Sequence, residues 1–204
     1  MIGIIDLSIG NTASVQKALR RVGVEFSLIT SESDLARCDG VLFPGVGNFN
    51  TAISRLLDLQ LFAPLKRLIS DNEIPFLGIC LGMQILADHS EEGDTETHGL
   101  GIFRGRVTRL PRDSDLFRVP HVGWNTVEST GRGLFFGTNP NSDFYFTHGY
   151  YLKTFDEDLE IFYTDYGIKI PAYIRKGNVH GVQFHPEKSD IDGLEILNNF
   201  AKLC

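Results

Sequence analysis

One cysteine of this chain lies in a local sequence that suits a nucleophile. Cys80 is the centre of Gly78–Gly82, a G-x-C-x-G sequence between a strand-like apolar run and a helical pattern. This is the cysteine counterpart of the nucleophile elbow, a sharp strand-to-helix turn that exposes the reactive atom. The helix N-terminus also favours a thiolate through its unpaired N–H groups. Because a single buried cysteine usually has no chemical role, Cys80 needs further support.

That support comes from a histidine and a carboxylate near the C-terminus. His185-Pro186-Glu187 follows an alternating apolar strand. The proline fixes one backbone torsion, so we expect both side chains to lie on one side as the extended chain ends. Glu187 would then hold one imidazole nitrogen, while the other serves Cys80 as general base and later as general acid. The pattern predicts a Cys-His-Glu catalytic triad.

A tetrahedral intermediate at Cys80 would also need donors for its oxyanion. The N–H of Leu81 directly follows the nucleophile, and Val46 and Gly47 lie in the glycine loop Pro44–Gly47. Taken alone, this loop is compatible with any tight turn. It is a poor phosphate loop because no Lys-Ser/Thr pair follows it. We predict an oxyanion hole made by Leu81 with Val46 or Gly47.

The overall composition restricts the class of protein. With 204 residues, 42% of them hydrophobic, residues 1–204 are predicted to form a single domain. The three cysteines lack paired spacing, which argues against disulfides, and no histidine cluster has metal-ligand spacing. The net charge of -7 without a basic stripe argues against nucleic acid, and no apolar run is long enough for a membrane. We expect a soluble cytoplasmic protein.

The N-terminal half alternates strand and helix patterns, which is typical of a mainly parallel sheet with helices on its faces. Strands are predicted over residues 2–6, 25–29, 40–43 and 75–80, and helices over 12–22, 50–57, 62–70 and 81–87. The C-terminal half instead has short alternating runs typical of antiparallel additions. These predicted strands cover residues 106–110, 125–128, 144–147, 161–165, 172–175 and 179–184, before a helix at 194–203.

Three motifs together resemble the class I, triad-type glutamine amidotransferases. They are Pro44–Gly47, Gly78–Gln84 and His185–Ser189, and the resemblance extends over essentially the whole chain. Within that family, Pro120–Asn125 is most similar to the glutaminase subunits of imidazole glycerol phosphate synthases. The resemblance implies an α/β fold of flavodoxin-like type, with a mixed, mainly parallel sheet, flanking helices and antiparallel additions in the C-terminal half.

The resemblance also implies an activity and a partner. L-glutamine would be hydrolysed through a thioester on Cys80 without a cofactor. The ammonia would pass to a barrel-shaped cyclase subunit in a heterodimer, which makes imidazole glycerol phosphate and AICAR in histidine biosynthesis.

The resemblance assigns further residues to binding. Gln84 would bind the amino-acid group of glutamine, helped by Gly47 and by the backbone of His148, Gly149 and Tyr150. A second group would lie at the partner interface, where Trp124 is expected in a loop because of its neighbours. This group consists of Asn11, His121, Gly123, Trp124 and Asn125.

Other interpretations remain open at this point. The sequence departs from the common family pattern near residues 7–9, 121–122 and 147–150, outside the triad. A related glutaminase subunit that supplies ammonia for bacterial surface sugars is therefore the second enzyme hypothesis. An inactive interaction module on the same fold and an α/β cysteine hydrolase with another substrate are the others.

Overall fold

The parallel half of the central sheet begins at the N-terminus. The computed structural model describes residues 1–8, 12–71, 74–93, 96–111 and 118–204. Neighbouring strands in this half run parallel, as the alternating pattern predicted. In spatial order they are β2 (Phe26–Ile29), β1 (Ile2–Ile5), β3 (Gly40–Gly45), β4 (Phe76–Cys80) and β13 (Val179–Val182).

Antiparallel strands extend the same sheet beyond β13. Each is paired antiparallel with its neighbour, so the expected mixed α/β architecture is confirmed. The strands follow in the order β12 (Lys169–Lys176), β11 (Glu160–Asp165), β8 (His121–Glu128) and β9 (Asn141–His148).

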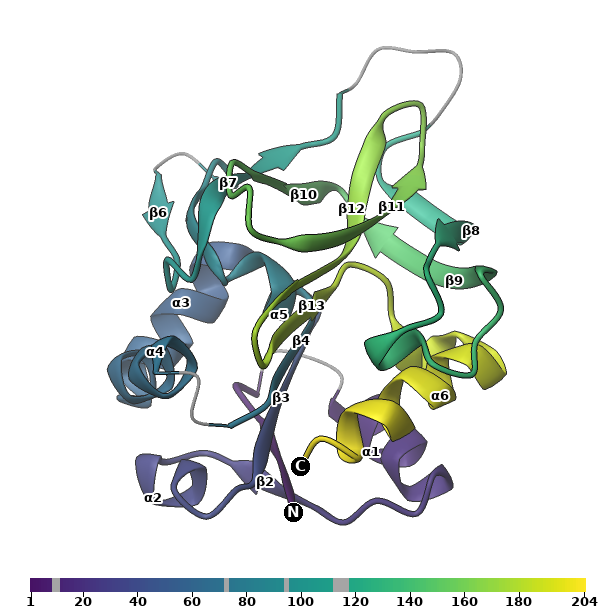
Figure 1. Cartoon of the computed structure of the whole chain (residues 1–204). Coiled ribbons are helices and arrows are strands. Elements are labelled where there is room, and N and C mark those ends of the chain that lie inside the picture. The colour runs from purple at the N-terminus through teal and green to yellow at the C-terminus, as the bar shows by residue number, and fades with distance from the viewer. Residues whose placement is uncertain (9–11, 72–73, 94–95, 112–117) are drawn as a thin grey trace.

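A smaller second sheet lies above the parallel half in Figure 1. Three of its strands were not predicted from the sequence, because β5 and β6 are polar and β10 directly follows β9. The sheet has the order β10 (Tyr150–Thr154), β7 (Phe103–Arg109), β5 (Ala87–Ser90) and β6 (Thr97–His98).

The helix after Cys80 is shorter than predicted. It was expected over residues 81–87, but α5 covers only Leu81–Gln84, and Ala87 already begins β5. The carbonyl of Ile85 accepts from the N–H of Leu100 at 2.7 Å instead of continuing the helix. Long-range pairing therefore overrides the local helical pattern at this point.

Helices cover the two faces of the parallel half, as Figure 1 shows. α3 (Phe49–Asp58) and α4 (Phe62–Ser70) lie on one face, and α1 (Thr12–Arg21) and α6 (Asp190–Ala201) on the other. The short α2 (Glu32–Leu35) was not predicted, and α6 begins four residues before the predicted start at 194. Each face has its own apolar core, so the sheet is buried on both sides.

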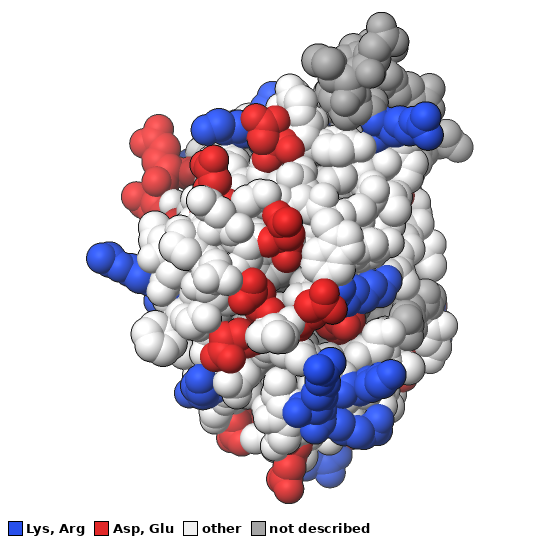
Figure 2. Space-filling view, turned by 90° about the vertical axis from the view of Figure 1, so that its right-hand side faces the viewer, with Lys and Arg blue, Asp and Glu red and all other residues white. Residues whose placement is uncertain are grey.

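Figure 2 shows the face of the molecule that carries α1 and α6. Acidic and basic side chains are both present on this face, with a group of basic side chains towards its lower end. No helix in the described part of the chain is long and apolar enough to span a bilayer.

Candidate active site

Cys80 occupies a strained position at the end of β4. Its backbone has φ 52° and ψ −103°, and α5 begins at the next residue. Residues other than glycine rarely adopt a positive φ, and such positions cluster at functional sites. The strand therefore ends in a sharp turn that holds the thiol in the lining of a pocket, and Cys80 is only 6% exposed.

Glycines make room for this turn. A Cβ on Gly78 would lie 2.2 Å from the carbonyl oxygen of Gly82, and one on Gly82 would lie 2.0 Å from the carbonyl oxygen of Phe43. Either contact is closer than real Cβ atoms allow, so strand β4, helix α5 and strand β3 pack together only with glycine here. The G-x-C-x-G spacing thus has a steric cause at both glycines.

The histidine and its carboxylate reach the same edge of the sheet as Cys80. β13 is parallel to β4, with Val182 paired to Ile79, so both chains leave the sheet on one side. His185 Nδ1 lies 2.8 Å from Glu187 Oε1, and both side chains are buried. The extended chain ends here, as expected, and residues Pro186–Lys188 form a 3-10 helix, η2.

This environment favours a charged imidazole. Burial lowers the pKa of His185, but the adjoining Cys80 thiolate and the hydrogen-bonded Glu187 carboxylate outweigh it and raise the pKa to about 10. Within the described ranges, the buried Nε2 atom of His185 has no hydrogen-bond partner. Since Nδ1 is held by Glu187, Nε2 is the nitrogen left to exchange a proton with Cys80 or its substrate.

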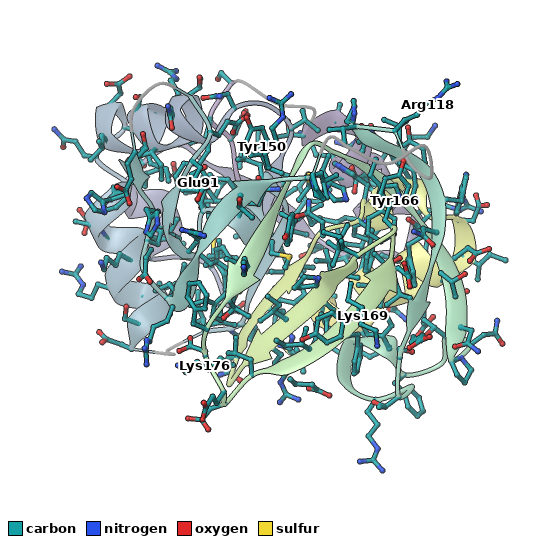
Figure 3. The ribbon with its side chains drawn as sticks, turned by 90° about the horizontal axis from the view of Figure 1, so that it is seen from above. Glu91, Arg118, Tyr150, Tyr166, Lys169 and Lys176 are labelled. Carbon is teal, nitrogen blue, oxygen red and sulfur yellow. The ribbon has the colours of Figure 1, made fainter. Side chains whose placement is uncertain are left out.

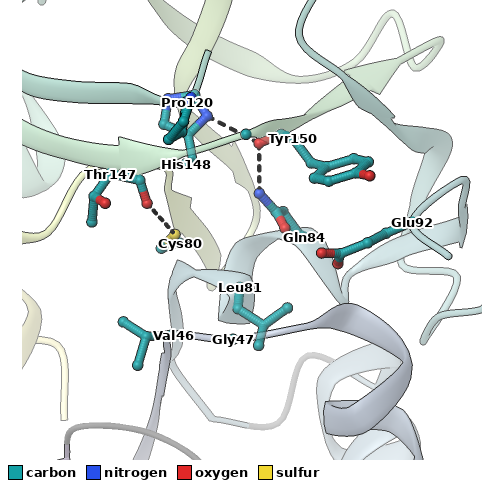
Figure 4. Close-up of a pocket in the computed structure, with 11 residues that line it drawn as sticks. Val46, Gly47, Cys80, Leu81, Gln84, Glu92, Pro120, Thr147, His148 and Tyr150 are labelled. Atoms are coloured by element: carbon teal, nitrogen blue, oxygen red, sulfur yellow. Dashed lines mark hydrogen bonds between the residues drawn. The ribbon is translucent and has the colours of Figure 1, made fainter.

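A pocket of about 270 Å³ opens at Cys80 (Figure 4). Every residue predicted for the oxyanion hole and for substrate binding lines it, although the segments lie far apart in sequence. His185 and Glu187 are not part of the lining. The lining consists of Val46, Gly47, Cys80, Leu81, Gln84, Glu92, Pro120, Thr147, His148, Gly149 and Tyr150.

Gln84 is anchored within the wall of the pocket. Its side chain is only 5% exposed, and Nε2 donates to the carbonyl oxygen of Tyr150 at 2.8 Å and to Oε1 of Gln183 at 3.1 Å. The amide nitrogen is therefore occupied by the protein. The oxygen Oε1 is the atom of this amide that remains to face a ligand.

Sequence reasoning missed Glu92. This half-buried side chain lines the pocket, and its Oε2 accepts from the backbone N–H of Phe49 at 2.7 Å. The bond holds the carboxylate at the N-terminus of α3, where a negative charge is favoured. Glu91 and Glu92 look alike in the sequence, and only the long-range contact with Phe49 distinguishes them. Pro120 and Thr147 also line the pocket and were not among the predicted site residues.

The residues expected at a partner interface divide into two groups. Trp124 is 50% exposed on one face of β8, together with Val122, which was not among the expected residues and is 56% exposed. His121 lies on the opposite face and is only 2% exposed, so its side chain is not on the surface. Gly123 and Asn125 belong to the strand rather than to a loop. The expectation for Asn11 lies outside the described residues.

The exposed face of β8 continues onto β9. Trp124 pairs with Tyr145, and their rings meet edge to face at 6.1 Å. Val122 pairs with Thr147, whose carbonyl oxygen lies 3.9 Å from the Cys80 sulfur. An exposed aromatic and aliphatic surface therefore adjoins the pocket.

The described residues contain no cluster of three histidine, cysteine, aspartate or glutamate side chains that could hold a metal ion. The chemistry that the site itself offers is nucleophilic. A cysteine sulfur beside a charged imidazole, with backbone N–H groups at the start of a helix, is suited to acyl transfer.

Known proteins support this interpretation. The family model described as glutamine amidotransferase class-I matches residues 3–203. The imidazole glycerol phosphate synthase subunit HisH of Methanocaldococcus jannaschii is 45% identical over 100% of both chains. The subunit of the same name from Moorella thermoacetica is 42% identical over 99% of this chain and 94% of its own length.

A solved structure agrees at the level of the fold. The crystal structure of a glutamine amidotransferase superposes with a TM-score of 0.78 at 20% identity, covering 99% of this chain and 97% of that one. The family match spans the elbow of Cys80, the glycine loop and the His-Pro-Glu motif. This chain belongs to the class I glutamine amidotransferase family.

Proposed function

We propose that the chain is the glutaminase subunit of an imidazole glycerol phosphate synthase. The observation that carries the proposal is the pocket itself, which has the Cys80 thiol and the Glu92 carboxylate in one lining. A glutamine side chain presents an amide to the thiol, while its α-ammonium needs a negative partner. The full-length similarity to subunits of that name supports the choice within the family.

The reaction follows from the positions of Cys80 and His185. The thiolate attacks the side-chain amide carbon of glutamine, and negative charge develops on the amide oxygen. The N–H of Leu81, with Val46 or Gly47 from the facing loop, stabilises that oxyanion. His185 gives its proton to the departing nitrogen, and ammonia leaves as the carbon–nitrogen bond breaks.

Hydrolysis of the resulting thioester restores the enzyme. His185, now neutral, takes a proton from water as the water oxygen attacks the acyl carbon. The carbon–sulfur bond then breaks and glutamate is released. Glu187 holds the imidazole in the required orientation during both halves of the reaction and stabilises its charged form.

Recognition of the substrate is divided among polar groups of the pocket. Glu92 pairs with the α-ammonium of glutamine, and the oxygen Oε1 of Gln84 accepts from it. Gly47 and the backbone of His148, Gly149 and Tyr150 complete the binding of the amino-acid group. The amide nitrogen of Gln84 has a supporting role, since it holds the Tyr150 carbonyl.

A cyclase subunit of barrel shape is the proposed partner in a heterodimer. The exposed side chains of Val122 and Trp124 provide the apolar anchor that interfaces typically need. Because Thr147 joins this surface to the pocket, ammonia would be released close to the partner. The surface thus connects the site of hydrolysis with the site where ammonia is used.

The test is ammonia release from glutamine by the purified chain, alone and with a cyclase subunit plus its nucleotide substrate. We expect the chain alone to release ammonia slowly. The cyclase subunit with its nucleotide substrate should strongly stimulate this release, and an imidazole product should form. Cys80→Ala is the blank and should lose the release completely. Trp124→Ala should weaken partner binding by about tenfold or more, while labelling of Cys80 by a glutamine-like electrophile stays normal.

The outcomes separate the competing hypotheses. Labelling of Cys80 without stimulation would overturn the partner assignment and favour another ammonia acceptor, such as a surface sugar. Failure of both labelling and hydrolysis would overturn the glutaminase assignment itself.

A further inference from the structure

A series of hydrogen-bonded, buried amide side chains ends at the Cys80 sulfur. Gln183 lies between β13 and His185 and is completely buried. Its Nε2 atom is 3.4 Å from the sulfur, and its Oε1 atom is 3.1 Å from Nε2 of Gln84. The same nitrogen of Gln84 is 2.8 Å from the carbonyl oxygen of Tyr150. The mechanism described above gives Gln183 no role.

Hydrogen-bond chemistry determines which atom donates and which accepts at each step of this series. A backbone carbonyl oxygen can only accept, so the Gln84 atom that faces Tyr150 must be the amide nitrogen. The second N–H of this nitrogen donates to Gln183, so the Gln183 atom that accepts it must be the amide oxygen. The remaining end of Gln183 is therefore an N–H donor, and it faces the sulfur of Cys80.

One histidine, His148, bonds the same carbonyl, and a second, His121, bonds His148 in turn. His148 Nδ1 donates to the Tyr150 oxygen at 3.0 Å, so its Nε2 accepts from Nδ1 of His121 at 3.1 Å. Nε2 of His121 then faces the amide nitrogen of Asn125 at 3.5 Å, which also donates to the carbonyl oxygen of Asp165 at 2.8 Å. The two histidines therefore both donate towards the Tyr150 carbonyl, and Asn125 links them to Asp165.

This arrangement requires both histidines to be neutral. Burial lowers the pKa of His148 to about 3 and the pKa of His121 to about 4. His121 is further held by the ring of Tyr166, stacked at 3.8 Å, and the Tyr166 hydroxyl donates to the carbonyl oxygen of Arg118 (Figure 3). The hydrogen-bond network is thus anchored to β8 and β11 at one end and reaches the Cys80 sulfur at the other.

We propose that Gln183 is a further catalytic residue, whose buried N–H stabilises negative charge on the Cys80 sulfur. This inference rests on the proposed function, in which that sulfur is the nucleophile. A hydrogen bond to the charged form of a group favours ionisation. The donor acts twice, because the sulfur also becomes negative when the thioester breaks and the carbon–sulfur electron pair returns to it.

A purely structural role for Gln183 predicts different behaviour. A buried amide that only satisfies Gln84 would affect stability and leave the ionisation of Cys80 unchanged. The pH dependence of thiol reactivity therefore separates the two roles. It also requires no turnover, so it can be read even where glutamine hydrolysis is not observed.

The experiment compares the full-length wild type with Gln183→Met, which keeps a similar side-chain length without a donor. The reagent is iodoacetamide, and modification of the Cys80 peptide is followed by mass spectrometry across a pH series. We expect the midpoint of alkylation to rise by about one pH unit, since one hydrogen bond to a charged group is lost. In the complex, kcat should fall about tenfold or more with KM little changed.

Two further variants make the test decisive. Gln16→Met, on α1, removes an amide that contacts Thr12 and Arg20 and should leave the midpoint unchanged. If Gln183→Met does not fold, Gln183→Glu keeps the acceptor for Gln84 but replaces the donor, and the midpoint should rise as well. An unchanged midpoint in a folded Gln183 variant would overturn the proposal.

Discussion

Two regions around Cys80 use buried histidines in opposite ways. In the catalytic region, Glu187 and the Cys80 thiolate raise the pKa of His185 to about 10. In the pocket wall, His148 is as deeply buried, but burial lowers its pKa to about 3 and its close neighbour is another histidine, His121. The neighbouring charge, more than burial, therefore decides whether a histidine moves protons or only directs hydrogen bonds.

The two regions also differ in how they are encoded. The catalytic region is encoded in one short segment that contains Gln183, His185 and Glu187. This segment follows β13, which runs parallel to β4 and so ends beside Cys80. The pocket wall is assembled from segments that meet only after folding, including β8, β9 and the polar segment with Glu92. Changes in the first region should therefore affect turnover, and changes in the second should affect binding or stability.

The largest effect is expected from Glu187→Gln. The amide can no longer stabilise the charged imidazole, so kcat should fall on the order of 10³- to 10⁴-fold while KM changes little. The measurement is steady-state ammonia release in the complex with the cyclase subunit. Glu160→Gln, at the ion pair with Arg175, is the matched control. A fall of less than tenfold would show that Glu187 does not orient His185.

Glu92→Gln should have an intermediate effect that differs in kind. Loss of the charge that pairs with the α-ammonium should raise KM on the order of 10- to 100-fold, with a smaller change in kcat. The adjacent Glu91→Gln is the control, because Glu91 contacts Thr108 and Arg106 instead of the pocket. An equal KM in the two variants would remove Glu92 from the binding site.

The smallest effect on activity is expected at His121, whose contribution is to stability in acid. Its folded pKa of about 4 lies below the ordinary histidine pKa of 6.5, so the unfolded chain binds more protons between these values. The free energy of unfolding should therefore decrease as pH falls from about 6.5 towards 4, by at most about 3 kcal/mol from this residue.

His121→Asn should make that dependence less steep. Asparagine can still donate to His148, but it does not titrate. Denaturant unfolding between about pH 7 and pH 5 measures the slope, and His98→Asn, at an exposed position, is the control. Equal slopes for His121→Asn and the wild type would show that His121 does not titrate as proposed.

The sequence allowed much of the parallel sheet and of the catalytic region to be predicted. Cys80, its flanking glycines and His185 follow local rules, because an elbow, a close approach and a proline-fixed turn each impose a residue type. The end of α5 at Gln84 could not be predicted, because Leu100 competes for the carbonyl that would continue the helix. Local patterns do not contain such distant competitors.

The pocket wall was predictable only in part: the local motifs supplied its oxyanion-hole residues, and the family resemblance supplied its substrate-binding residues. Gln84, His148 and Tyr150, which the resemblance assigned to substrate binding, line the pocket, whereas no local pattern distinguishes Glu92 from Glu91. His121 was expected at a surface, but strand alternation places it on the buried face opposite Trp124. Period-two alternation carries this information only when the strand boundaries are known.

The backbone at Cys80 has a consequence for how this gene can change over generations. The backbone angles of Cys80, φ 52° and ψ −103°, favour glycine. Any residue with a side chain costs roughly 1–3 kcal/mol of folding free energy at this position. Selection on folding alone would therefore tend to replace the nucleophile. A cysteine that persists at this position in descendants would record continued selection for chemistry, and a lineage that no longer needs ammonia should acquire glycine there early.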